Sequence, residues 1–183
     1  AGQRQPGGMA AILGLDAAPL AEICARAQQA TGLPVQVAND NCPGQIVISG
    51  ASPALQAACD LAGESGAKKV VPLQVSIASH SPLMAEAAAE FARAVAAVPI
   101  RTPAVPVIGN TTARPLADAN AIRAELVAQL TGSVRWTESI EFLLADQVGR
   151  FVEIGPKDVL TNLIKRIDRQ ASRLSVQDAA GIE

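Results

Sequence analysis

Hydrophobic positions in the first 75 residues repeat with two different periods. Apolar side chains recur at helical spacing (i, i+3, i+4, i+7) in two stretches: Leu20, Ile23, Cys24 and Ala27, and then Leu55, Ala58, Cys59 and Ala62. Short apolar runs at 8–15, 35–38, 45–49 and 70–75 predict strands before, between and after these helices. The turn-forming residues 39–44 are predicted to connect the two middle strands. The order β-α-β-β-α-β over residues 8–75 predicts a ferredoxin-like domain.

From residue 76 onward, longer helical stretches alternate with short and strongly apolar runs. Runs at 105–108 and 151–154 predict strands, and apolar faces predict helices around 84–95, 122–130, 140–144 and 160–167. This alternation is typical of a parallel sheet covered by helices, so the fold class is α/β. Because two or three strands make only part of such a sheet, residues 76–167 are interpreted as part of a larger domain with unpaired strand edges. Residues 168–183 are polar, have no apolar stripe, and are expected to form a surface tail.

Composition and charge exclude several classes of partner. The 183 residues carry 15 Lys and Arg against 17 Asp and Glu, and 2% of them are aromatic, so a nucleic acid would find neither a basic surface nor a stacking platform. No apolar run approaches the ~20 residues of a membrane-spanning helix, and residues 1–8 are too polar for a signal peptide. Cys24, Cys42 and Cys59 are odd in number and form no CxxC pair, so we expect free thiols and a cytoplasmic protein.

His80 is the only histidine of the sequence, which excludes metal sites with two imidazoles and leaves at most one Ser–His or Cys–His pair. It stands where a predicted strand gives way to a helix that Ser81 and Pro82 begin, a place where catalytic side chains are often held. The residues alone leave two interpretations open: a catalytic base, or a loop histidine that is hydrogen-bonded to the backbone. The sequence contains no G-x-S-x-G nucleophile elbow, no G-x-G-x-x-G motif and no P-loop.

Six blocks of residues resemble malonyl-CoA:acyl carrier protein transacylase and occur in that family's order. They are 41–50 (NCPGQIVISG), 79–84 (SHSPLM), 106–110 (PVIGN), 134–140 (VRWTESI), 153–156 (EIGP) and, as the sixth, 159–161 with 163–167 (VLT and LIKRI). The resemblance implies a small ferredoxin-like domain inserted in a large α/β-hydrolase-like domain, of which this sequence supplies the C-terminal part. The family's GHSxG elbow and its malonyl-binding arginine precede the matching region. Arg4 is not in the setting of that arginine and is not assigned its role.

The resemblance also implies a reaction: a serine takes the malonyl group from coenzyme A as an ester and passes it to the phosphopantetheine thiol of acyl carrier protein, without cofactor or metal. His80 would be the base for that serine, and the main-chain carbonyl of Gln129 would accept the other N–H of its ring. The remaining implied residues line the pocket or dock the carrier protein: Asn39, Asn41 and Asn110 for the pocket, and Lys68, Lys69, Lys165 and Arg166 for docking. Without the resemblance, the asparagines on the predicted turn are turn formers and the basic pairs are solvated charges. We expect malonyl-CoA and acyl carrier protein as partners, and a monomer when the protein is complete.

Ser79 leaves the identity of the acyl group open. In polyketide synthases, methylmalonyl-selective domains of this family tend to have a serine before the histidine and malonyl-selective domains a phenylalanine, whereas stand-alone fatty-acid enzymes commonly have Ser-His and use malonyl. The other blocks resemble the stand-alone enzymes, so malonyl is expected, with a methylmalonyl-type polyketide synthase domain as the alternative. A non-catalytic piece that binds carrier protein is a further alternative. The chain alone is expected to form no malonyl ester, because the base has no nucleophile to activate.

Overall fold

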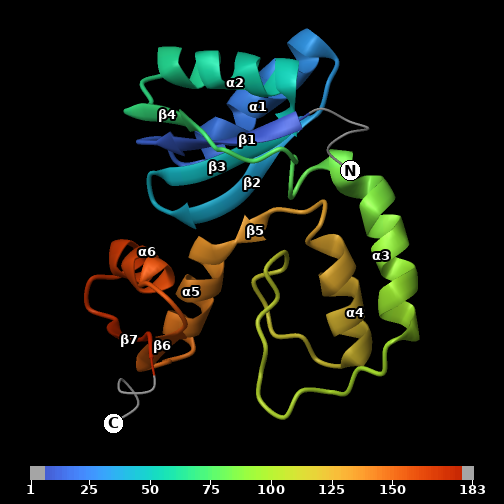
Figure 1. The fold of residues 1–183 in the computed structure, drawn as a ribbon. Coiled ribbons are helices and arrows are strands. Elements are labelled where there is room, and N and C mark those ends of the chain that lie inside the picture. Colours follow the sequence, from blue (N-terminus) through green and yellow to red (C-terminus); the bar gives the residue numbers. More distant parts are fainter. Residues whose placement is uncertain (1–6, 179–183) are drawn as a thin grey trace.

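The computed structural model describes residues 7–178, and their first six elements form one unit (Figure 1). These elements are β1 (Gly7–Leu13), α1 (Ala17–Thr31), β2 (Val35–Cys42), β3 (Gln45–Ala51), α2 (Ser52–Glu64) and β4 (Lys69–Pro72). The four strands pair antiparallel in the order β4-β1-β3-β2. The predicted order of elements is therefore confirmed.

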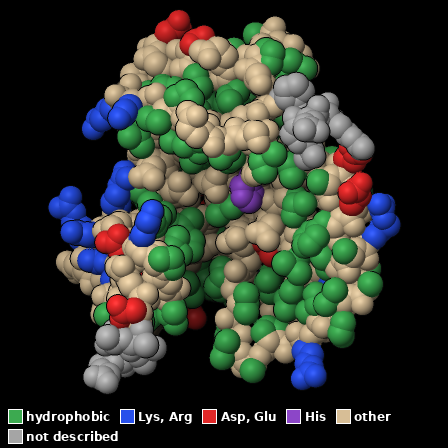
Figure 2. Space-filling view, in the orientation of Figure 1, with side chains coloured by type: hydrophobic (Ala, Val, Ile, Leu, Met, Phe, Trp, Pro, Cys, Tyr) green, Lys and Arg blue, Asp and Glu red, His purple; other side chains and the backbone are tan. Residues whose placement is uncertain are grey.

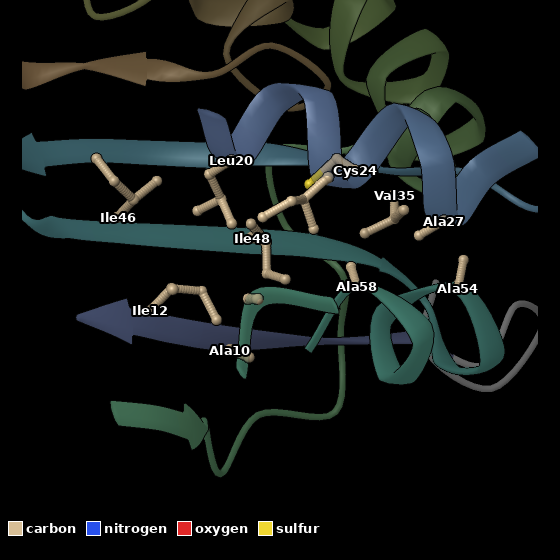
Figure 3. Packing of buried hydrophobic residues seen from close by; sticks show 12 residues of the cluster. Ala10, Ile12, Leu20, Cys24, Ala27, Val35, Ile46, Ile48, Ala54 and Ala58 are labelled. Carbon is tan, nitrogen blue, oxygen red and sulfur yellow. The ribbon is translucent and has the colours of Figure 1, made fainter. Parts of the chain in front are cut away.

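Helices α1 and α2 cover one face of this sheet and enclose the main hydrophobic core (Figure 3). The cluster joins the inward faces of both helices to the facing strands: Ala10, Ile12, Leu20, Ile23, Cys24, Ala27, Val35, Ile46, Ile48, Ala54, Ala58 and Ala62. The face predicted for α1 is confirmed in full. In α2, Ala54 is buried while Leu55 and Cys59 are only half-buried, so the true face is rotated by about one residue. α1 ends at Gly32, whose φ of 68° is a left-handed conformation that favours glycine.

The rest of the described chain lies away from α1 and α2, on the side of the sheet where β2 is found (Figure 1). It consists of η1 (Pro82–Met84), α3 (Ala85–Ala97), α4 (Ala119–Ala128), β5 (Val134–Arg135), α5 (Trp136–Ala145), β6 (Arg150–Ile154), α6 (Val159–Ile167) and β7 (Ser172–Val176). β6 and β7 form a two-stranded parallel sheet, and the α/β class is confirmed. β5 pairs parallel with β2 and extends the first sheet to the order β4-β1-β3-β2-β5. Between residues 7 and 178, every helix is too short or too polar to cross a membrane.

The predicted connection at residues 39–44 is wrong, because most of it is strand. β2 continues as far as Cys42, and only Pro43 and Gly44 remain as the turn to β3. The strand is irregular, with register shifts between Val37 and Asn39 and between Asp40 and Cys42. The turn preference of Asn and Asp is overcome here because pairing with β3 on one side and β5 on the other satisfies the backbone.

Two further predictions fail in the second half of the chain. Residues 105–108 form no strand, and the segment makes a single bridge, from Ile108 to Pro115. The expected surface tail is also incorrect, because Ser172–Val176 forms β7 and pairs with β6 over five residues. Residues 179–183 of that expected tail lie outside the described residues. The domain boundaries at residues 75 and 167 stay predictions.

Candidate active site

The ring of His80 is held by main-chain carbonyls from the segment that follows α4. Its Nδ1 atom lies 2.6 Å from the carbonyl oxygen of Gln129 and 3.2 Å from that of Gly132. Because a carbonyl only accepts hydrogen bonds, this arrangement requires the proton on Nδ1 and leaves the lone pair of a neutral ring on Nε2. A ring in this tautomer can accept a proton at Nε2, which is the chemistry of a general base.

The loop before η1 gives the His80 ring its direction. Ser81 is fully buried, and its hydroxyl donates to the carbonyl oxygen of Ala78 at 2.7 Å. The hydroxyl oxygen of Ser81 in turn accepts a hydrogen bond from the N–H of Leu83, so Ser81 caps the short helix that Pro82 begins. His80 itself has a φ of 56°, a left-handed conformation that is uncommon for a residue with a side chain. The side chain of Ser81 thus holds the backbone before His80, at Ala78, and after it, at Leu83.

Gln129 and Asn110 are joined to His80 in one chain of contacts. Asn110 Nδ2 donates to the side-chain oxygen of Gln129 at 3.1 Å, while the main-chain oxygen of Gln129 contacts the histidine ring. The loop that carries Asn110 is fixed by the buried carboxylate of Glu125, which accepts from Thr111 N at 2.8 Å and from Thr111 Oγ1 at 2.7 Å. Glu125 lies one helical turn before Gln129, so the same helix end positions both partners.

Asn39 reaches this region through the pairing of β2 with β5. It is half-buried and pairs with Val134, and the next residue, Arg135, donates its N–H to the carbonyl oxygen of Asn110 at 2.8 Å. The structure therefore brings Asn39 and Asn110 to neighbouring backbone segments. Asn41 is also half-buried on β2, but no hydrogen bond within residues 7–178 links it to the other candidate residues.

The four basic residues gather near the turn between β2 and β3. Lys68 and Lys69 stand at the start of β4, where Lys68 N donates to Leu13 O. Arg166, near the end of α6, donates to the carbonyl oxygen of Pro43 at 3.1 Å and to the side-chain oxygen of Gln45, and Lys165 beside it is exposed. Figure 2 shows Lys and Arg side chains on the side of the molecule where α6 lies and β4 begins. This group is separated from the histidine by the length of β2, roughly 20 Å at ~3.3 Å per residue.

Two residues near the site carry no signal in the sequence. Gln36 on β2 donates to the main-chain oxygens of His80 and Thr131, and nothing distinguishes it from any other glutamine of a strand. Asp40 is half-buried and accepts from Thr137 Oγ1 at 2.6 Å. Burial raises the pKa of Asp40 above its ordinary value, and the hydrogen bond from Thr137 partly opposes that rise. Both contacts join residues about 95 positions apart, which no local pattern indicates.

Part of the surface below the sheet is apolar and open. Among residues 7–178, β6 pairs with β7 along one edge and has no partner on the other, and its side chains Val152 and Ile154 are 49% and 81% exposed. Beside it, an apolar pocket is lined in part by Ile108, Trp136 and Leu160. The indole N–H of Trp136 is buried and has no hydrogen-bond partner in the part of the chain that the structure describes. Figure 2 shows this face hollowed between the α5 and α6 side and the α3 and α4 side, with the histidine above the hollow.

Comparison with known proteins gives consistent matches over nearly the whole chain. A family model described as an acyl transferase domain matches residues 3–182. The malonyl CoA-acyl carrier protein transacylase of Bacillus subtilis is 43% identical over 177 residues, which are 97% of this chain and 56% of that protein. A solved structure of the enzyme of that name from Coxiella burnetii superposes with a TM-score of 0.92 at 42% identity, covering 97% of this chain and 55% of the other. A complex of a type II polyketide synthase acyl-carrier protein with its malonyl-transacylase also has a TM-score of 0.92, at 40% identity. The chain thus spans about half the length of the relatives it matches.

Proposed function

The chain belongs to the acyl transferase domain family, and from this membership we propose that it supplies the catalytic histidine of a malonyl-CoA:acyl carrier protein transacylase. The observation that carries the proposal is the 2.6 Å contact from His80 Nδ1 to the carbonyl oxygen of Gln129. It leaves Nε2 as the proton acceptor, and the neighbouring side chain of Asn110 is held in place by its hydrogen bond to Gln129. The nucleophilic serine comes from a segment outside this sequence.

The proposed reaction uses the same histidine twice. As the serine oxygen attacks the thioester carbon of malonyl-CoA, its proton passes to His80 Nε2, and the protonated ring then gives that proton to the departing coenzyme A sulfur. In the second half-reaction the ring takes the proton of the phosphopantetheine thiol and returns it to the serine when the ester breaks. Throughout, the Gln129 carbonyl favours the ring with a proton on Nδ1, both as the neutral base and as the cation.

The arrangement along β2 supports acyl carrier protein as the second substrate. The basic residues near the β2–β3 turn can attract an acidic protein, and the strand leads from there past Asn41 and Asn39 to the histidine. We propose that the phosphopantetheine arm follows this strand, with Asn39, Asn41 and Asn110 contacting its amides or the acyl group. Arg166 is already bound to the turn, so Lys68, Lys69 and Lys165 provide the more adaptable charges. As a complete protein, the enzyme is proposed to be a cytoplasmic monomer.

The open apolar surface fits a protein of which this chain is one part. One edge of β6 has no partner strand within the described residues, and a parallel strand from another segment would bury Val152, Ile154 and the neighbouring apolar pocket. The relatives hold nearly half of their length outside the region that this chain matches. We propose that this remaining half carries the serine and covers the exposed face.

Complementation tests this proposal. The chain is co-expressed with the segment of the Bacillus subtilis relative that it does not match, and transfer of malonyl from malonyl-CoA to acyl carrier protein is followed by mass spectrometry. We expect transfer from the assembled pair and none from this chain alone. Ile154→Lys should prevent assembly, because it places a charge on the surface to be buried, whereas His80→Ala should assemble without efficient transfer.

Three outcomes would contradict the proposal. An assembled His80→Ala pair that forms the seryl ester as fast as the wild-type pair would show that His80 is not the base. A clear preference for methylmalonyl-CoA would favour a polyketide synthase acyltransferase instead. Tight binding of acyl carrier protein by this chain, without acyl transfer in any assembly, would favour a non-catalytic carrier-binding piece.

A further inference from the structure

A single side-chain amide ties the histidine loop to the segment that holds the histidine ring. Gln36 Nε2 donates one hydrogen bond to the carbonyl oxygen of His80 at 2.8 Å and a second to that of Thr131 at 2.9 Å. An amide nitrogen carries two hydrogens, so both of its donors are used. Thr131 lies between Gln129 and Gly132, the two residues whose carbonyls contact the ring. Gln36 therefore bridges the backbone of the histidine and the turn that its ring contacts.

The irregular register of β2 places Gln36 on the side of the sheet where the site lies. Gln36 pairs with Ser49, and Asn39 pairs with Val47, whose side chain belongs to the small cluster on the face away from α1 and α2. Directly paired residues of neighbouring strands share a face, so the extra residue at Ala38 keeps Gln36 and Asn39 on one face in spite of their odd spacing. The same strand thus presents a proposed substrate contact and the bridge to the histidine.

The conformation of His80 explains why such a bridge is needed. With a φ of 56°, its backbone is in a region that a residue with a side chain occupies only when its surroundings hold it there. The hydrogen bond from Gln36 fixes the direction of the carbonyl group of this strained residue itself. The second hydrogen bond, to the carbonyl oxygen of Thr131, holds residues 129–132 next to the backbone of His80. Loss of either one frees the ring to leave the Gln129 carbonyl.

We propose that Gln36 is a positioning residue, which holds His80 and the turn at Gln129 together so that Nδ1 keeps its proton and Nε2 remains the base. This inference rests on the proposed function only where it takes the His80 ring to be the base. The position of the proton is a property of this chain and can be measured without acyl transfer. Because Gln36 lies on β2, the small sheet sets the geometry of the base.

The single histidine makes the test direct, because imidazole nitrogen signals in an NMR spectrum of the chain come from His80 alone. The ¹⁵N shifts at alkaline pH, where free imidazole is neutral, report which ring nitrogen carries the proton. We compare the wild-type chain with Gln36→Met, which keeps the length of the side chain and removes both donors. Ser49→Ala is the matched control: it is buried directly opposite Gln36, and its hydroxyl has no hydrogen-bond partner in the described structure.

We expect the Nδ1-protonated form to dominate in the wild-type chain and in Ser49→Ala. In Gln36→Met, the ratio of the two tautomers should move toward Nε2 protonation by roughly threefold to tenfold, the weight of one intramolecular hydrogen bond. If Gln36→Met does not fold, Gln36→Asn decides, because its shorter amide can reach only one of the two carbonyls. A folded Gln36 variant with the wild-type ratio would overturn the inference, and so would an equal change in Ser49→Ala.

The complemented enzyme separates this inference from the proposed function. Gln36→Met should lower kcat for malonyl transfer and leave the KM for malonyl-CoA nearly unchanged, because both donors of the Gln36 amide are used within the chain. A shifted tautomer ratio in a pair that never transfers malonyl would refute the function and keep the positioning role. If Gln36→Met changes neither the tautomer ratio nor the turnover of an active pair, the positioning role is refuted and the proposed function is kept.

Discussion

The contrast between His80→Ala and Gln129→Ala tests the candidate site most sharply. The first change removes the group that takes the proton of the serine. The second removes only a side chain, because the oxygen that contacts the histidine ring at 2.6 Å belongs to the main chain and remains. In the complemented enzyme we therefore expect a large loss of turnover from the first variant and a small one from the second.

The structure sets the size of both effects. Loss of a general base typically lowers the rate by ~10²–10⁴-fold. Gln129→Ala breaks one neutral hydrogen bond, the 3.1 Å contact from Asn110 Nδ2, which is worth about 0.5–1.5 kcal/mol. Even if this whole free energy were lost from the transition state, the rate would fall only about 2–12-fold. The two variants should thus differ by about tenfold or more.

The assay measures each half-reaction separately, with rapid-quench formation of the malonyl ester first and transfer to acyl carrier protein second. Asn110→Ala serves as the partner variant, because it breaks the same hydrogen bond from the other side. If Asn110 also contacts the substrate, Asn110→Ala should raise KM more than Gln129→Ala does. Equal losses in His80→Ala and Gln129→Ala would refute the reasoning, since the main-chain contact would then not be what positions the base.

Three other predictions follow from contacts and burial. At low salt, Lys165→Glu and Arg166→Glu should both raise the KM for acyl carrier protein without changing ester formation from malonyl-CoA, and only Arg166→Glu should also lower Tm, because that side chain binds the β2–β3 turn. Burial raises the pKa of Asp40, so the protonated carboxyl contributes to the free energy of unfolding at acid pH, and this contribution is lost as the pH rises through the raised pKa. Asp40→Asn should therefore raise Tm at neutral pH, and the difference in Tm should disappear below pH 3.8, the ordinary pKa of the group. In urea unfolding, Gly50→Ala should cost about 1–3 kcal/mol because its Cβ would lie 2.3 Å from a main-chain oxygen, whereas Gly63→Ala in α2, with no atom within 4 Å, should stabilise by up to about 1 kcal/mol.

The elements that the sequence predicts well are those whose pattern and partners are close together in the chain. The face of α1 and the order of the first six elements follow from spacing alone, because each helix packs on strands that flank it. Residues 105–108 show the opposite case. Their apolar run is typical of a buried strand, but no strand lies beside it within residues 7–178, and Val105 is 69% exposed. An apolar run forms a strand only when the neighbour it needs is present.

Some residues of the candidate site could likewise be predicted from the sequence and others could not. The sequence singles out His80 because it is the only histidine, and the family resemblance indicates the main-chain carbonyl of Gln129, which the structure places in contact with the ring. Their catalytic roles stay predictions. Gln36 and Glu125 could not be found in advance, because each acts through contacts with loops that only the folded chain brings near. Single polar residues on ordinary elements carry no pattern that spacing could reveal.

The pairing of β5 with β2 has a consequence for the order in which the chain folds. Within the small sheet, β2 and β3 form a hairpin of neighbouring segments and β1 pairs with β3 and β4, whereas the contacts that assemble the histidine site, such as that from Gln36 to Thr131, close a loop of 95 residues. Closing such a loop costs about 2 kcal/mol more in chain entropy than closing one of ~10 residues. We therefore expect the small sheet to form early and β5 to dock late, with its amides exchanging with solvent before those of β3 in the native state. The base becomes competent only after this 95-residue loop has closed, so the folding chain acquires its catalytic geometry later than its small sheet.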